Sequence, residues 1–134
     1  RYFENPIYEY EVYGIAEKEM QNKFQAILVC REQEYAGEKV LRIVDFLGEH
    51  RLFAGLSDFL REKLEVYEYI DLYCYGFNTN YVKEAGMVEL LEEDTNVIPN
   101  FFSPYVKHNI DIWVGTPKGK AVFFKADGDQ DRPG

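Results

Sequence analysis

The chain has little of what marks several large classes of protein. Among 134 residues there are two cysteines, two histidines and one tryptophan, which is too little cysteine for a disulfide-stapled secreted scaffold. No apolar run approaches the roughly 20 residues that cross a bilayer, and the polar start, residues 1–5, lacks a signal-peptide pattern. We therefore expect a cytoplasmic domain with no membrane partner.

Basic clusters are also missing from the sequence. The formal net charge is -9, with 15 Lys and Arg against 24 Asp and Glu, and no basic run is longer than two residues. Nucleic-acid binding depends on basic patches, because contacts with the phosphate backbone supply much of the affinity. The composition therefore disfavours DNA and RNA as partners.

Motifs for metal binding and for several enzyme classes are absent as well. His50 and His108 are far apart, and no cysteine or carboxylate lies at metal-site spacing around them. Alternating aspartates near the C-terminus lack the later glycine and distal glutamate of a calcium loop, so we expect a polar tail over residues 127–134. The chain has no G-x-S-x-G elbow, P-loop or dinucleotide fingerprint. We therefore predict no metal site.

The sequence is rich in apolar and aromatic residues. With 46% hydrophobic and 16% aromatic residues it can bury a core, and a single domain is expected over residues 1–126. Because the chain does not begin with methionine, we expect a segment of a longer protein that lacks N-terminal elements. Cys30 and Cys74 lie in strand-like runs and are expected to be buried free thiols, with a disulfide or a nucleophile as the alternatives.

The spacing of apolar residues predicts the order of the elements. Alternating or β-branched runs indicate strands, and apolar residues at helical spacing indicate an amphipathic helix. Strands are predicted over residues 7–15, 24–35, 39–47, 69–75, 88–91, 110–114 and 120–125, and helices over 52–66 and 80–85.

Two connections between these elements define the fold class. The glycine-bearing link at residues 36–38 is typical of an antiparallel hairpin. The step from strand 39–47 through helix 52–66 to strand 69–75 fits a crossover between parallel strands. We therefore predict an α/β (α+β) domain with a mixed, mostly antiparallel sheet that contains one parallel crossover pair.

The segment Asn80–Met87 (NYVKEAGM) resembles a stretch found in the Gcn5-related N-acetyltransferase (GNAT) superfamily. There a short helix carries a tyrosine, followed by Glu or Lys and by Ala-Gly leading into a strand. In element order the resemblance covers residues 7–115. It implies a GNAT-like fold without its N-terminal elements, and transfer of an acyl group from acetyl-CoA or another acyl-CoA to an amine of a small metabolite, sugar or peptide.

The same resemblance implies a place for the cofactor. In that family the pyrophosphate rests on backbone amides of a Q/R-x-x-G-x-G/A loop at a helix start, where amide N–H groups and the helix dipole favour an anion. Aligned from Arg51, the matching loop has Ala54 and Leu56 in place of the small residues. The alternative is that the glycines at 48 and 55 only end a strand and permit close helix packing. The implied cofactor-binding residues are Gly48, His50, Arg51, Ala54 and Gly55.

Asp45 is the candidate general base. It is expected on the same strand face as Leu41 and Ile43, where a buried carboxylate without a partner would be costly. The alternative is a structural role, as an ion pair with Arg42 or Arg51 or a hydrogen bond with a loop amide.

Tyr81 occupies the tyrosine position of the family's motif and is the candidate general acid, with a core or surface aromatic as the alternative. Proton transfer requires such groups within hydrogen-bond reach of the reacting atoms. Asp71, Tyr73 and Tyr75 share one face of the strand 69–75. They are predicted to line an acceptor pocket, or else to form a polar surface.

Other functions remain open at this stage. A domain of this fold could have lost acyl-CoA chemistry and serve as a binding or scaffolding module of a larger protein. The two hypotheses differ in whether the loop presents open amides or is plugged by Glu49, Phe53 or Leu56. A donor such as charged tRNA is disfavoured by the acidic charge. An open sheet edge would favour a homodimer.

Overall fold

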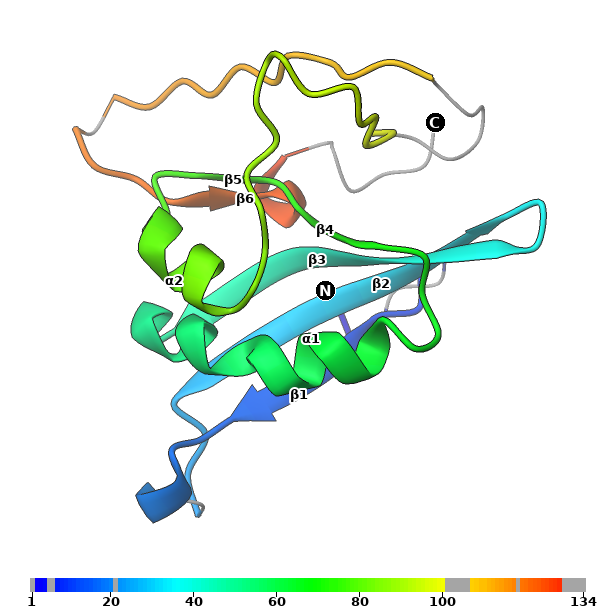
Figure 1. Ribbon diagram of the computed structural model, residues 1–134. Helices are drawn as coiled ribbons and strands as arrows, with labels where there is room; N and C mark the ends of the chain where they lie inside the picture. The colour runs from blue at the N-terminus through cyan, green and yellow to red at the C-terminus, as the bar shows by residue number, and fades with distance from the viewer. Residues whose placement is uncertain (1, 5–6, 21, 101–106, 118, 129–134) are drawn as a thin grey trace.

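The computed structural model describes residues 2–4, 7–20, 22–100, 107–117 and 119–128 (Figure 1). These residues form an α+β fold with a four-stranded mixed sheet in the order β1-β2-β3-β4 and a two-stranded sheet of β5 and β6. The elements are β1 Glu11–Ile15, η1 Lys18–Met20, β2 Ala26–Tyr35, β3 Glu38–Gly48, η2 His50–Leu56, α1 Ser57–Lys63, β4 Ile70–Leu72, β5 Cys74–Tyr75, α2 Thr79–Glu84, β6 Phe123–Phe124 and η3 Lys125–Asp127.

The long hairpin of β2 and β3 confirms the predicted antiparallel pair. Tyr35 pairs with Glu38 at its tip, and Ala36 and Gly37 between them both have positive φ, at 54° and 87°. Two such residues suit the right-handed twist of the flanking strands, which is why short hairpins favour this turn. The register shifts between Val29 and Cys30. Because of this β-bulge, the residues at the end of β3 face the opposite side of the sheet from the one that simple alternation predicts.

The parallel crossover is also confirmed. Leu41 of β3 pairs with Ile70 of β4, and the two strands run parallel. Their connection is a 3₁₀ helix, η2, followed by the short α1, where the sequence predicted one helix over 52–66. Gly55, a weak helix former, lies in the 3₁₀ part.

The second predicted helix is α2, and both of its ends follow the sequence signals. The side chain of Asn78 accepts a hydrogen bond from the amide of Asn80 at 3.0 Å and so caps the first turn. Gly86 follows the last turn with φ 90°, a conformation that favours glycine.

The helices cover one face of the main sheet, and most of the core lies between the helices and this face (Figure 1). The ring of Phe77 lies 5.4 Å from that of Phe53 and 5.3 Å from that of Phe124. Cys30 belongs to this core and is fully buried, as predicted, whereas Cys74 is exposed, so its predicted burial is wrong.

Several strands predicted near the C-terminus do not form. Residues 88–91 and 110–114 are not strands, and the prediction over 120–125 is reduced to β6. The segment after Gly86 leaves the sheet instead of pairing, and Val88 is 93% exposed. In the described part of the chain, β4 therefore has no strand partner on the side away from β3. Of the first predicted strand, residues 11–15 are β1.

None of the helices in the described ranges has the length and apolar character needed to span a bilayer. Of the predicted polar tail, residues 129–134 lie outside the described residues.

Candidate functional site

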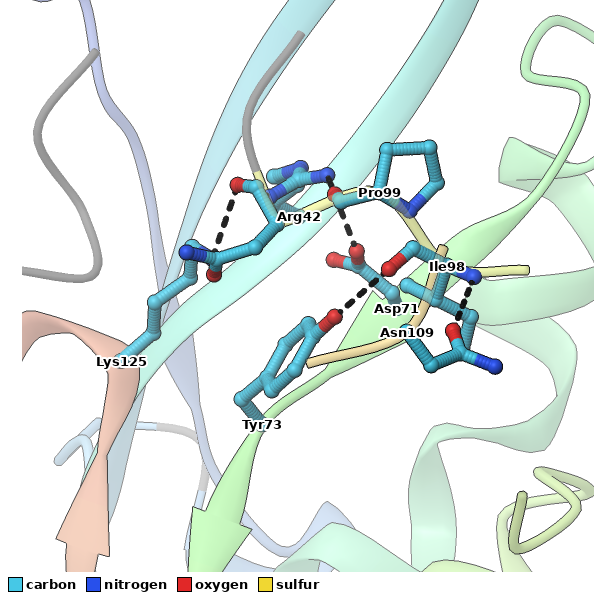
Figure 2. A network of polar contacts seen from close by, with 8 residues as sticks. Arg42, Asp71, Tyr73, Ile98, Pro99, Asn109 and Lys125 are labelled. Atoms are coloured by element: carbon cyan, nitrogen blue, oxygen red, sulfur yellow. Dashed lines mark hydrogen bonds and ion pairs between the residues drawn. The ribbon is translucent and has the colours of Figure 1, made fainter. Parts of the chain in front are cut away.

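A layer of buried charged residues covers the sheet opposite the helices, and Arg42 of β3 is its centre. Arg42 is 0% exposed. Its Nη1 donates to the carbonyl oxygen of Asn100 at 2.6 Å, and its Nη2 donates to the carbonyl oxygen of Pro99. The planar guanidinium presents several donors in a fixed fork. It therefore fastens the end of the long segment after α2 to the sheet (Figure 2).

Lys125 of η3 holds the same segment from the other side. Its Nζ donates to Oδ1 of Asn100 at 2.9 Å, and it lies 4.5 Å from the centroid of the Tyr73 ring. Lys125 is buried despite its charge, and such burial requires partners of this kind. Two cations from distant parts of the chain thus meet at Asn100.

Asp71 of β4 is the carboxylate of this layer. It lies opposite Arg42 in the parallel register, and its Oδ2 is 3.5 Å from Nη2 of that arginine. Among the described residues, neither carboxylate oxygen of Asp71 accepts a hydrogen bond. Burial raises the pKa of Asp71 to about 6, while the charges of Arg42, Lys125 and Arg31 act in the opposite direction.

Tyr73 and Asn109 tie the neighbouring stretch of chain in place. The Tyr73 hydroxyl donates to the carbonyl oxygen of Ile98 at 2.9 Å. The Ile98 amide donates to Oδ1 of Asn109 at 2.9 Å, and Nδ2 of Asn109 donates to the carbonyl oxygen of Asn96 at 2.8 Å. These bonds fix residues 96–98 beside β4 and β5 (Figure 2).

A pocket of about 400 Å³ lies along β4 and β5, between α2 and the segments around residues 87–90, 98 and 109–110. Its volume is within the range of small-molecule sites, roughly 300–1,000 Å³. The structure brings the three predicted acceptor residues to this pocket, since Asp71, Tyr73 and Tyr75 all line it.

Cys74 also lines the pocket and was not predicted there. It is exposed, and partial desolvation together with the nearby Glu89 carboxylate raises the pKa of its thiol. The thiol is therefore protonated near neutral pH. Arg42 and Lys125 were likewise not predicted as site residues, although Arg42 interrupts an otherwise apolar strand.

Asp45 lies on the other side of the sheet from the position predicted for it. Leu41 and Ile43 face the core under the helices, but the bulge pairs Asp45 with Val29, which belongs to the small cluster on the opposite face. Directly paired residues share a face, so the predicted common face with Leu41 and Ile43 is wrong. The Asp45 carboxylate accepts hydrogen bonds from the Tyr2 hydroxyl and from the Phe46 amide at 2.9 Å.

Tyr81, the candidate general acid, is half-buried on α2 and packs against the core on the helix side. Its ring lies 6.3 Å from that of Phe77. Asp45 and Tyr81 therefore lie on opposite faces of the sheet, and the structure does not bring them to one reaction centre.

The predicted cofactor segment begins tightly against β2. Gly48 has φ 101°, and a Cβ there would clash with the carbonyl oxygen of Gln25. That oxygen accepts a hydrogen bond from the Glu49 amide at 3.0 Å. The His50 ring lies 5.0 Å from the ring of Phe77. The start of the segment is thus occupied by contacts within the protein.

The remaining residues of the segment do not converge on one point. Arg51 forms an ion pair with Glu17 and lies 3.8 Å from a carboxylate oxygen of Glu49. A Cβ at Gly55 would meet nothing within 4 Å, so the interpretation of this glycine as a close-packing position is wrong. Ala54 is half-buried beside it. The predicted plugging side chains Phe53 and Leu56 are buried in the core, and Glu49 is exposed.

In fold class the described residues thus form an α+β arrangement with a four-stranded mixed sheet, one parallel pair, a small second sheet and two α-helices. Comparison with family models, with curated proteins and with solved structures found no match. Within the described ranges, no group of three or more His, Cys, Asp or Glu side chains is placed to hold a metal ion.

Proposed function

We propose that this chain is a cytoplasmic small-molecule binding module of a larger protein, built on an acyltransferase-like order of elements but without acyl-transfer chemistry. The observation that carries the proposal is the separation of Asp45 and Tyr81 by the sheet. A general base and a general acid must both reach the reacting atoms, and these two side chains face different sides of the domain.

The contacts of the expected cofactor segment support the same proposal. A phosphate site at a helix start needs free amide groups and net positive charge. Here the Glu49 amide is bonded to Gln25, and Arg51 lies between the carboxylates of Glu17 and Glu49. Neutralised in this way, Arg51 offers little attraction for a pyrophosphate. The two free thiols, Cys30 and Cys74, are consistent with a reducing compartment.

Acyl transfer from acetyl-CoA is the second candidate function. It is favoured by the parallel pair of β3 and β4 with its helical crossover, followed by α2, which is the element order of the GNAT-like resemblance. In that case Tyr81 is the expected general acid, and Asp71, Tyr73 and Tyr75 would contact the amine acceptor.

A calorimetric titration of the full chain with acetyl-CoA and desulfo-CoA separates the two functions. The binding-module proposal expects no saturable heat for either compound at millimolar concentration. Micromolar binding that Arg51→Glu weakens and Arg61→Glu leaves unchanged would overturn it in favour of the transferase. Arg61 is a suitable control because it is an exposed arginine of α1 that pairs with Asp58.

Homodimer formation remains an expectation. β1 and β4 are the two edge strands of the main sheet, and open edges invite pairing with another chain. Gel filtration with light scattering would measure the mass, and a clean monomer at high protein concentration would contradict the expectation.

A further inference from the structure

The outer half of β2, residues 31–35, lies at an open edge of the main sheet. The ladder between β1 and β2 stops at the pair Glu11 and Cys30, whereas β2 continues beyond it. A cavity of about 550 Å³ lies between residues 7–11 and residues 31–33. In the described part of the chain, the outer half of β2 therefore has a strand neighbour only on the side of β3.

The main-chain groups of this edge point outward. The Lys39 carbonyl oxygen and the Leu41 amide of β3 are hydrogen-bonded to the stretch that leads into β4, at 2.9 and 3.2 Å, so they point away from β2. Glu34 and Glu32 lie opposite them in the antiparallel register. Because the main-chain groups of such a pair point outward on both strands, those of Glu32 and Glu34 point away from β3. Within the described ranges they have no hydrogen-bond partner.

The side chains of this edge carry an excess of negative charge. Side chains alternate along a strand, so Glu32 and Glu34 face the helix side of the sheet, as Cys30 does. Both carboxylates share one cation, Lys39, which lies 2.9 Å from Glu32 and 3.9 Å from Glu34. Glu9 is exposed and lines the cavity beside them. A single lysine therefore offsets only part of the negative charge.

A second copy of the chain does not suit this edge. Two copies of β2 paired antiparallel about Gln33 would place Glu32 of one copy opposite Glu34 of the other. Like charges directly opposite each other are destabilising, and the net charge of -9 adds repulsion between copies. A strand with positive side chains at alternate positions would instead place each cation opposite a glutamate.

We propose that the outer half of β2 binds an extended peptide with Lys or Arg at alternate positions, which adds to the sheet as an antiparallel strand. Main-chain hydrogen bonds to Glu32 and Glu34 supply affinity, as in other cases of strand addition. The cations face the two carboxylates, and the uncharged residues between them face the side of Arg31 and Gln33. The inference goes beyond the proposed small-molecule role and does not depend on the pocket along β4 and β5.

Two labelled peptides, TKVKVKT and TEVEVET, test the charge of the partner. Fluorescence anisotropy with the full chain measures binding in about 0.15 M sodium chloride, which screens long-range attraction. TKVKVKT should bind saturably, and TEVEVET should bind at least about tenfold more weakly because it repeats the like-charge contacts. Equal binding of the two peptides, or no saturable binding of TKVKVKT at millimolar concentration, would overturn the proposal.

Methylation of the peptide main chain separates strand addition from attraction between charges. Residues opposite Glu32 and Glu34 exchange main-chain hydrogen bonds with them, whereas the residues between point their amides away. Methylation of two lysine main-chain nitrogens in TKVKVKT should weaken binding at least about tenfold, since two hydrogen bonds are lost. Methylation of the two valine nitrogens is the matched control and should be tolerated. Equal effects of the two modifications would overturn strand addition.

A charge-reversal variant locates the binding edge. Glu34→Lys should weaken TKVKVKT at least about fivefold, because a lysine of the peptide then meets a like charge. Glu84→Lys is the matched control, since Glu84 is exposed on α2, which packs against η2 at the far end of β3 from the hairpin turn (Figure 1). It should leave binding within about twofold. Equal weakening by both variants would show that net charge alone attracts the peptide and would overturn the proposal.

Hydrogen exchange of individual amides tests the geometry directly. The amides of Glu32 and Glu34 should exchange rapidly in the free chain, and TKVKVKT at about 90% occupancy should slow both about tenfold. The Gln33 amide faces β3 and should stay protected throughout, which shows that the hairpin is intact, also in Glu34→Lys. Peptide binding that leaves the Glu32 and Glu34 amides unprotected would overturn the proposal.

The same exchange measurement tests the other occupant of the edge. Light scattering gives the mass of the wild-type chain without peptide. A dimer in which the Glu32 and Glu34 amides are already protected would assign the edge to a second copy and overturn the basic peptide as its partner. Rapid exchange of both amides at the same protein concentration is the expected result.

Discussion

The two faces of the main sheet are built from alternate residues of the same strands but are stabilised in different ways. On the helix side, Leu41, Ile43 and Phe46 of β3 meet the rings of Phe53 and Phe77. This face depends on apolar burial, which is not directional.

On the opposite side, Arg42 of β3, Asp71 of β4 and Lys125 of η3 are buried together, and the two cations donate to the main-chain carbonyl groups of Pro99 and Asn100. Directed bonds hold a long, irregular segment there without a strand partner. The comparison shows how a small sheet can carry a pocket, because the apolar face maintains the fold while the polar face positions the pocket wall.

The largest expected effect is on the apolar face. Phe77→Ala should lower the free energy of unfolding by about 4 kcal/mol, because it leaves a cavity among five aromatic rings. Urea denaturation measures the change, and Phe24→Ala is a control because Phe24 is 69% exposed. Similar losses for both variants would contradict the assignment of the core to the helix side.

On the polar face, Arg42→Met should lower the free energy of unfolding by about 3 kcal/mol, because it leaves the Asp71 charge and two carbonyl groups without their buried cation. Adding Asp71→Leu should restore part of the loss, since an apolar pair of similar size avoids an uncompensated charge. If the double variant loses more free energy of unfolding than the two single variants lose when added together, this account is wrong.

The pH dependence of the free energy of unfolding should further distinguish the polar face, which carries the buried carboxylate of Asp71, from the apolar face. Asp71 has a pKa of about 6 in the folded state against 3.8 for an unperturbed group, so the folded state binds its proton more tightly. Protonation of Asp71 therefore stabilises the folded state most below pH 4. This stabilisation, about 2 to 3 kcal/mol, is lost as the pH rises through 6. Urea denaturation between pH 4 and 7 should show this decline in the wild type relative to Asp71→Asn, and parallel curves would refute it.

The sequence predicted the elements whose signals are local. The hairpin follows from a short glycine-bearing link between two apolar runs, and α2 follows from the Asn78 cap and the Gly86 stop. The strand predicted over 88–91 does not form. Contacts with a neighbouring strand stabilise a β-strand, and an alternating pattern in the sequence does not supply that neighbour.

The polar layer depends on contacts that no local pattern encodes. Arg42 binds Asn100 across 58 residues, and the bulge that turns Asp45 to the opposite face arises only in the paired register. Asp71, Tyr73 and Tyr75 do line one pocket, but the alternate residues Ile70, Leu72 and Cys74 line it as well, so alternation along the strand does not account for the lining. Their contact with an acceptor stays a prediction.

The smallest expected effect concerns the pocket wall. Tyr73→Phe removes the hydroxyl that donates to the Ile98 carbonyl oxygen and should lower the free energy of unfolding by about 1 kcal/mol. Tyr75→Phe is the matched control, because Tyr75 lines the same pocket but is 54% exposed.

A local measurement is more sensitive than denaturation here. The Ile98 amide is bonded to Asn109, so its hydrogen exchange reports opening of the wall. Exchange at this amide should become roughly fivefold faster in Tyr73→Phe and remain unchanged in Tyr75→Phe. If Tyr73→Phe leaves the Ile98 exchange rate at its wild-type value, the wall is held by the Asn109 and Arg42 contacts alone, and the part assigned to Tyr73 in shaping the pocket is wrong.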